Sequence, residues 1–188
     1  MKTFLLLTFL FLSLGTYAQD TLEVAPNDTT VAIDTFVYNR VILDTNIEKA
    51  ILIGLCTEDG LRTSPIFSNY YEKEYNNYEP DLEFLETLTL TLSKVNIVVI
   101  LGSWCSDSQR EVPRLMRVLD ELNFSLDSLQ IIAVDRMKTV PDVDISRYMI
   151  EFVPTIIFYV DDFEIGRIVE APVETIEDDM ASFFMKVF

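Results

Sequence analysis

The stretch that decides the fold is residues 96–108, Asn-Ile-Val-Val-Ile-Leu-Gly-Ser-Trp-Cys-Ser-Asp-Ser. Its first six residues form an almost continuous apolar run, which is typical of a strand buried on both faces of an α/β sheet. The residues after it lead into a helical pattern over residues 109–122. Cys105 therefore falls where a strand gives way to a helix, and the first turn of a helix both exposes a thiol and stabilises its thiolate. This corner is the candidate active site.

The elements that follow the corner alternate in type. Residues 130–135 and 155–160 predict two further buried strands, and residues 163–169 alternate apolar and polar as an antiparallel strand would. Helical patterns occupy residues 142–149 and 173–187. The predicted fold class is therefore α/β, with a central mixed β-sheet flanked by helices on both faces.

The region before Asp81 has weaker patterns. Residues 36–43 contain short β-like runs that would add a strand, whereas apolar residues between 46 and 55 are spaced as in a helix. Residues 64–78 place aromatic side chains on one helical face. Such a stripe is either a ligand platform or, more commonly, core packing. Its members are Phe67, Tyr71, Tyr75 and Tyr78. Asp81 itself is suited to be the N-cap of a helix.

The first 18 residues have the composition of an export signal. Lys2 precedes a continuous apolar run over residues 4–14, and small residues lead to Ala18, as signal peptidases require. A membrane anchor is the alternative, but it needs roughly 20 apolar residues. We therefore expect residues 1–18 to be a signal peptide and the mature protein to be exported, to a periplasm or the extracellular space. Residues 19–80 would form an N-terminal extension, a flexible arm plus an added helical element, and residues 81–188 the main domain.

Composition and charge exclude several classes of function. Of 188 residues, 49% are apolar, which is enough for one buried core. The 31 acidic and 14 basic residues give a net charge of -17, which repels nucleic acid and anionic lipid surfaces. The chain has no histidine, so Ser-His-Asp and Cys-His catalysis are excluded. The acidic pairs lack the glycine and bidentate glutamate of a calcium loop, and we expect no metal and no cofactor.

Residues 81–188 resemble the thioredoxin superfamily in the order and separation of their motifs. These motifs are Trp104-Cys105-x-x-Ser108, Pro113 in the following helix, Phe152-Val153-Pro154-Thr155 before the next strand, and the closing hairpin and helix. The resemblance implies a thioredoxin-like fold in which Cys105 is the attacking thiol and Pro154 is a cis-proline that faces it. It also implies that Trp104 borders the thiol, that the backbone of Val153 pairs with the substrate chain, and that Glu170 lies in a loop near the site.

Departures from the family pattern centre on Ser108, which stands where a dithiol enzyme has its resolving cysteine. A hydroxyl cannot displace a mixed disulfide, so an external thiol must complete the cycle. Val99 occupies a strand position where many thioredoxins bury an acid. Cys56 is the only other cysteine, either a resolving thiol or, more commonly, a small buried hydrophobe. Ser108 with Glu111 also fits a helix capping box, which would give Ser108 a structural role.

These features lead to two functional expectations. The first is an exported protein with a single active-site thiol, Cys105, that forms mixed disulfides with protein or low-molecular-weight thiols. Such an activity would be that of a thiol-disulfide oxidoreductase or isomerase of the monothiol type. Near the thiol, Asp107 should disfavour the thiolate and Arg110 should favour it. The alternative is a non-catalytic binding or folding-assistance module that uses the groove beside the cis-proline. No membrane partner is expected after signal cleavage.

Overall fold

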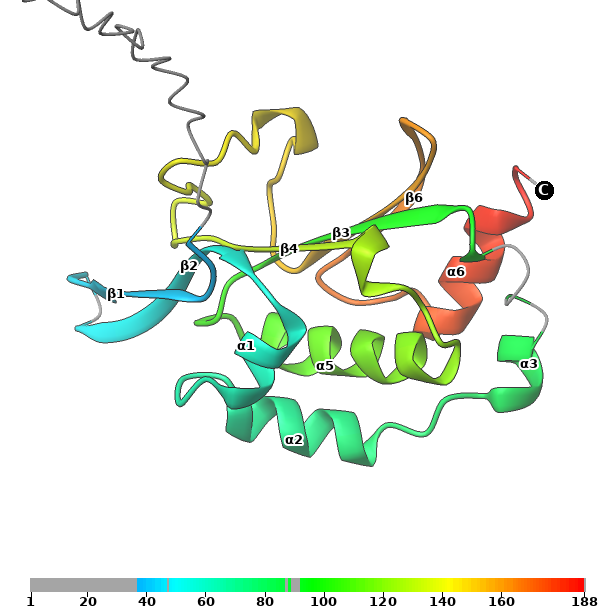
Figure 1. Ribbon diagram of the computed structural model, residues 1–188, viewed down its shortest axis with the longest axis horizontal. Helices are drawn as coiled ribbons and strands as arrows, with labels where there is room; N and C mark the ends of the chain where they lie inside the picture. The colour runs from blue at the N-terminus through cyan, green and yellow to red at the C-terminus, as the bar shows by residue number, and fades with distance from the viewer. Residues whose placement is uncertain (1–36, 47, 87, 89–91, 188) are drawn as a thin grey trace, which may run out of the picture. The chain divides into compact units, whose positions relative to one another are not determined.

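A six-stranded mixed β-sheet forms the centre of the structure (Figure 1). The computed structural model describes residues 37–46, 48–86, 88 and 92–187, so the predicted signal peptide and most of the flexible arm lie outside the described residues. The strands, in their order across the sheet, are β1 (Arg40–Asp44), β2 (Lys49–Cys56), β4 (Leu129–Ala133), β3 (Val95–Leu101), β5 (Thr155–Val160) and β6 (Phe163–Val169). β3 runs parallel to β4, and the other neighbouring pairs are antiparallel.

The apolar run of residues 96–101 forms the inner strand β3, as predicted. β3 lies between β4 and β5, and Val99 is in register with Ile131 on one side and Ile156 on the other. Val99 and Ile100 point to opposite faces and are both fully buried. A strand covered on both faces has no polar side to show, and for this reason its sequence lacks the alternation of a surface strand.

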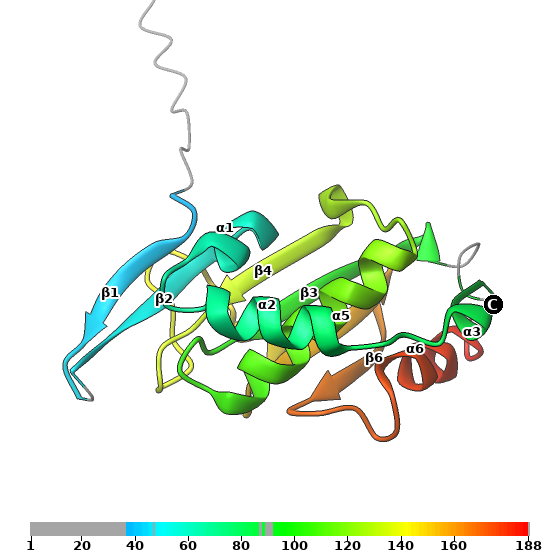
Figure 2. The ribbon, with the colours of Figure 1, turned by 90° about the horizontal axis from the view of Figure 1, so that it is seen from below.

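The α-helices of the described residues pack on one face of the sheet (Figures 1 and 2). They are α1 (Glu58–Thr63), α2 (Ser68–Asn77), α3 (Leu82–Glu86), α5 (Ser106–Glu121) and α6 (Ile176–Phe184). α5 turns its buried residues Val112, Leu115 and Leu119 toward the strands. Within the described part of the chain, no helix has the length and apolar character needed to cross a bilayer.

The opposite face is covered by an irregular segment between β4 and β5. Its only regular element in the described residues is the 3-10 turn η2 (Ser146–Tyr148), from which Tyr148 packs onto the sheet. The prediction of a helix over residues 142–149 is therefore wrong, and α-helices flank one face of the sheet rather than both. Asp142 and Met149 have φ values of 65° and 50°, and left-handed residues at both ends prevent a right-handed helix from extending.

The prediction of a helix between residues 46 and 55 is also wrong, because this segment forms β2. β2 lies between β1 and β4, and residues 51–54 are buried. A short apolar run buried in this way has the same composition whether it is strand or helix, so periodicity cannot separate the two.

The remaining elements before Asp81 join the same core. One compact unit spans residues 35–188, and α2 packs against α5 within it. Phe67 and Tyr71 are fully buried, which confirms that the aromatic stripe is core packing. Asp81 accepts a hydrogen bond from the Phe84 amide at 3.1 Å, as a cap of α3 should.

Candidate functional site

Cys105 occupies the N-cap position of α5. Its carbonyl accepts a hydrogen bond from the Gln109 amide at 3.0 Å, and its own amide donates to the carbonyl of Gly102 at 2.8 Å. The side chain is half-buried, and the thiol donates to the carbonyl oxygen of Val153 at 3.1 Å. The predicted strand-to-helix corner is therefore present, with the sulfur directed at a backbone group from a distant part of the chain.

The peptide bond between Val153 and Pro154 is cis, as the resemblance implies. The carbonyl of Pro154 accepts a hydrogen bond from the Glu170 amide at 2.8 Å, so the residue after β6 is fixed beside the proline. These contacts bring Cys105, the cis-proline and Glu170 to one end of the sheet. Together with the closing hairpin and α6 they form the arrangement expected from the resemblance, and the fold is a thioredoxin-like α/β fold.

Trp104, the residue before Cys105, is held by three groups. Its Nε1 donates to the carbonyl of Val134 at 3.0 Å, and the guanidinium of Arg136 lies 4.8 Å from the ring centre. A Cβ atom on Gly102 would lie 2.6 Å from the indole ring, so the ring packs where only glycine leaves room. The sequence contains no signal for Arg136, because the contact depends on how the segment after β4 folds back over the corner.

Ser108 is fully buried, and its hydroxyl accepts a hydrogen bond from the Gly102 amide at 3.1 Å. The capping-box interpretation is wrong, because Cys105 is the N-cap and Ser108 lies three residues inside the helix. The structural role of Ser108 is instead to tie the first turn of α5 to the loop after β3. Val99, fully buried on the helix side of β3, offers no proton acceptor.

The charges beside Cys105 pair with one another. Arg110 forms an ion pair with Asp107 at 2.9 Å and a short contact with the buried carboxylate of Glu111. The hydrogen bond to Glu111 raises the pKa of Arg110. Asp107 and Arg110 were predicted to act on the thiolate in opposite directions, and their direct pairing means that part of each effect cancels.

Cys56 lies in the core on the helix side of β2. Burial raises the pKa of its thiol from 9.0 to about 11, and both cysteines are free. Cys105 packs against the opposite face of the sheet. Ser103, two residues before Cys105, contacts Leu52, which lies about 13 Å from Cys56 along an extended strand. Cys56 is therefore a small buried hydrophobe and does not face the site.

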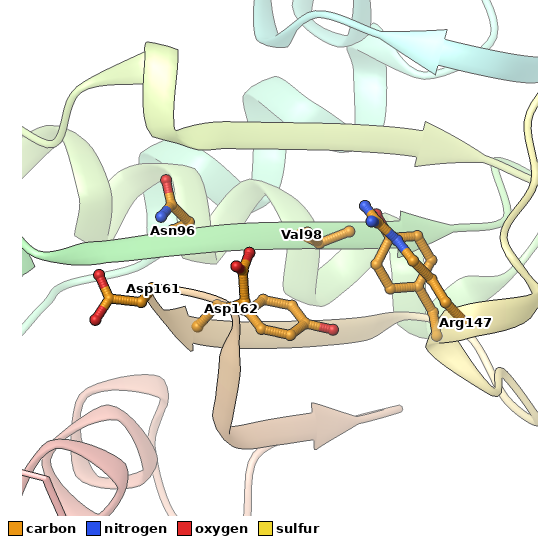
Figure 3. Close-up of a pocket in the computed structure, with 7 residues that line it drawn as sticks. Asn96, Val98, Arg147, Asp161 and Asp162 are labelled. Carbon is orange, nitrogen blue, oxygen red and sulfur yellow. The ribbon is translucent and has the colours of Figure 1, made fainter.

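A hollow of about 410 Å³ opens on the face opposite the helices, at the start of β3 (Figure 3). Arg147 lies at one end of it and the Asp161-Asp162 turn at the other. It is lined by Asn96, Val98, Arg147, Tyr148, Tyr159, Asp161 and Asp162. Because Cys105 follows the other end of β3, this hollow is separate from the thiol. Among the described residues, no group of three or more Cys, Asp or Glu side chains is placed to hold a metal ion.

Comparisons with known proteins return distant structural matches. No family model matches the chain, and no curated protein matches it. A protein of unknown function from Pseudomonas aeruginosa has 17% identity and a TM-score of 0.41 over 64% of this chain and 72% of its own. Fasciola hepatica thioredoxin has 17% identity and a TM-score of 0.34, over 54% of this chain and 89% of its own. An Entamoeba histolytica thioredoxin mutant has 18% identity and a TM-score of 0.33, over 55% and 93%. At these scores the description of the fold depends on the topology and contacts given above.

Proposed function

We propose that this protein is an exported thiol-disulfide exchange protein of the monothiol type, with Cys105 as its nucleophile. The observation that carries the proposal is the position of Cys105, half-exposed at the N-terminus of the 16-residue helix α5 and opposite the carbonyl of Val153. The other cysteine of the chain, Cys56, is buried in the core. A packing role alone would not require a thiol at the exposed position.

The exchange proceeds in two displacements. Loss of the Cys105 proton to water ends its hydrogen bond to Val153 and leaves a thiolate at the positive end of α5. This thiolate attacks one sulfur of a substrate disulfide, the sulfur-sulfur bond breaks, and the second substrate sulfur leaves as a thiolate that water protonates. The product is a mixed disulfide between Cys105 and the substrate. An external thiolate then attacks the substrate sulfur of that bond, forms a new disulfide with it, and releases the Cys105 thiolate.

The second displacement needs an external thiol because the chain has none in position. The hydroxyl of Ser108 accepts the Gly102 amide and cannot attack the mixed disulfide as a thiolate would. Cys56 lies on the other side of the sheet. Protein thiols and low-molecular-weight thiols outside the cytoplasm are the proposed partners. Trp104, Val153, Pro154 and Glu170 are the residues we propose to border the bound substrate.

The test is to detect the mixed disulfide directly. Purified protein is incubated with glutathione disulfide, quenched with acid and measured by intact-mass spectrometry. Wild type and Cys56→Ala should each gain one glutathione, and Cys105→Ser should gain none. Added reduced glutathione should remove the adduct. Absence of an adduct on wild type in these conditions would overturn the exchange function and favour a non-catalytic binding or folding-assistance module at the same groove.

A gain-of-function variant tests the proposed reason for monothiol chemistry. Ser108→Cys places a second thiol three residues after Cys105 and should allow the mixed disulfide to be resolved internally. We expect this variant to reduce insulin disulfides with dithiothreitol as electron donor, at a rate above that of wild type. An unchanged rate, in a variant that forms the glutathione adduct normally, would show that the missing cysteine is not what limits the cycle.

A further inference from the structure

Strand β1 is an exposed edge of the sheet with an apolar sequence, Arg-Val-Ile-Leu-Asp. Val41 and Leu43 are 50% and 63% exposed, and Ile42 is also exposed. In the described residues β1 pairs with β2 alone, and Figures 1 and 2 show it at the margin of the sheet. An apolar edge strand without charged or proline residues at its centre is a template for pairing with another strand.

The direction of the backbone groups of β1 follows from one hydrogen bond in β2. The amide of Leu52 donates to the hydroxyl of Ser103 at 2.9 Å, on the side of β2 away from β1. Leu52 is directly opposite Val41 in the antiparallel register. Opposite residues in such a ladder either both point toward each other or both point away. The N–H and C=O groups of Val41, and of Leu43 two residues on, therefore point to the open edge.

We propose that β1 pairs in antiparallel orientation with β1 of a second copy of this chain, about a two-fold axis at Ile42. In this register Val41 lies opposite Leu43 of the second copy, and each of these two symmetric pairs exchanges two backbone hydrogen bonds. All outward backbone groups of Val41 and Leu43 are then satisfied. The two sheets join into one continuous sheet, and the two copies use the same surface, as a two-fold interface requires.

The charged residues at the two ends of β1 favour the antiparallel orientation and a second copy of the chain as the partner. The two-fold register places Arg40 opposite Asp44 of the second copy, and Asp44 opposite Arg40 of the second copy. Opposite charges directly across an antiparallel pair stabilise it, and a parallel arrangement would instead place like charges together. In the single chain Arg40 contacts the exposed Asp142 at 3.2 Å. The carboxylate of Asp44 is largely buried, accepts a hydrogen bond from the Asn46 amide at 2.9 Å and lies 3.8 Å from Arg136. The five-residue strand is thus complementary to its own reversed copy, which an unrelated strand would not be.

The dimer is expected to be weak and dependent on concentration. A five-residue edge forms a small interface, and such interfaces belong to transient complexes. The net charge of -17 on each copy also opposes association. Sedimentation equilibrium of the reduced protein over a wide range of concentrations, at about 0.15 M salt to screen the general repulsion, is the suitable measurement. The reductant prevents dimers that are linked by a disulfide between two Cys105 residues.

Charge reversal gives the most specific test. Arg40→Glu and Asp44→Lys each place like charges opposite one another at both ends of the paired strands. Each variant alone should associate about tenfold more weakly than wild type. A mixture of the two should regain association, because a heterodimer of the variants restores attraction at both ends. Equal association of wild type and both single variants, or no gain on mixing, would overturn the proposal.

A backbone variant keeps the test decisive if Asp44→Lys fails to fold. Val41→Pro removes an outward N–H and leaves the β1 to β2 ladder intact, because that N–H takes no part in it. Val41→Thr keeps both the shape and the N–H and is the matched control. We expect Val41→Pro to be monomeric and Val41→Thr to associate like wild type, with equal far-ultraviolet circular dichroism. Undiminished association of Val41→Pro would refute pairing through β1, as would a monomeric wild type at every concentration.

Discussion

Replacing Ser108 with alanine should destabilise the protein without removing its thiol chemistry. The hydroxyl accepts the Gly102 amide at 3.1 Å in a fully buried position, so Ser108→Ala leaves a buried N–H without its acceptor. Such an orphaned donor costs about 1–3 kcal/mol. Alanine returns about 0.5 kcal/mol through its better helix propensity. The net loss should therefore be about 0.5–2.5 kcal/mol, which at a urea m-value of about 2 kcal/mol/M would lower the unfolding midpoint by about 0.3–1.3 M.

Equilibrium urea unfolding, followed by circular dichroism, measures this loss. Ser106→Ala is the matched control, because Ser106 lies in the same helical turn but is exposed. Its unfolding midpoint should stay close to that of wild type. The Ser108→Ala variant should still form the glutathione adduct at Cys105 in the absence of urea, where nearly all of the protein is folded. Equal midpoints for the two variants would refute the structural role of Ser108, and loss of the adduct in folded Ser108→Ala would show that the hydroxyl takes part in the chemistry.

Three other substitutions test the packing around the site and the core. Gly102→Ala should displace Trp104, whose ring would lie 2.6 Å from the new Cβ, at a cost of about 1–3 kcal/mol. Because the chain has one tryptophan, its fluorescence emission should shift to longer wavelength, and an unchanged spectrum would contradict the contact. Burial raises the pKa of Cys56 from 9.0 to about 11, so the folded state keeps the thiol proton at pH values where the unfolded state has lost it. Wild type therefore loses stability as the pH rises from 9.0 to about 11. The stability advantage of wild type over Cys56→Ala should shrink by about 2–3 kcal/mol across that range, and a constant difference would disprove the burial effect. Tyr78→Phe removes the hydroxyl that donates to buried Glu177 at 2.7 Å and should cost about 1–3 kcal/mol in thermal or urea unfolding, whereas a neutral result would mean that another donor replaces it.

The candidate site could be predicted in outline because its parts carry local signals. Cys105 follows an apolar strand and precedes a helical pattern, and Pro154 precedes another apolar strand, so both could be placed at strand ends. Their juxtaposition was an implication of the resemblance, and the hydrogen bond from Cys105 to Val153 agrees with it. The predicted capping role of Ser108 was wrong, because the helix begins three residues earlier than the capping pattern suggested.

What the sequence by itself determined is the part of the structure that depends on near neighbours. The run of residues 96–101 has no polar side and had to be buried on both faces, and β3 is an inner strand for that reason. The absence of histidine limits the site chemistry regardless of fold. The sequence also distinguished the two cysteines, because Cys105 lies between a strand pattern and a helical pattern whereas Cys56 follows an apolar run.

Only the tertiary structure decided which long-range partners each residue meets. Residues 49–56 became a strand because β1 and β4 supply hydrogen bonds on both sides, a fact that no local period contains. The packing of the sheet against the helices likewise places Cys56 on the helix side of the sheet. It also brings the Ser108 hydroxyl to the Gly102 amide. The open edge of β1 likewise exists only because nothing in the described residues pairs beyond it. Periodicity reports a residue's immediate chain neighbours, whereas burial, ionisation and edge position depend on segments many residues away.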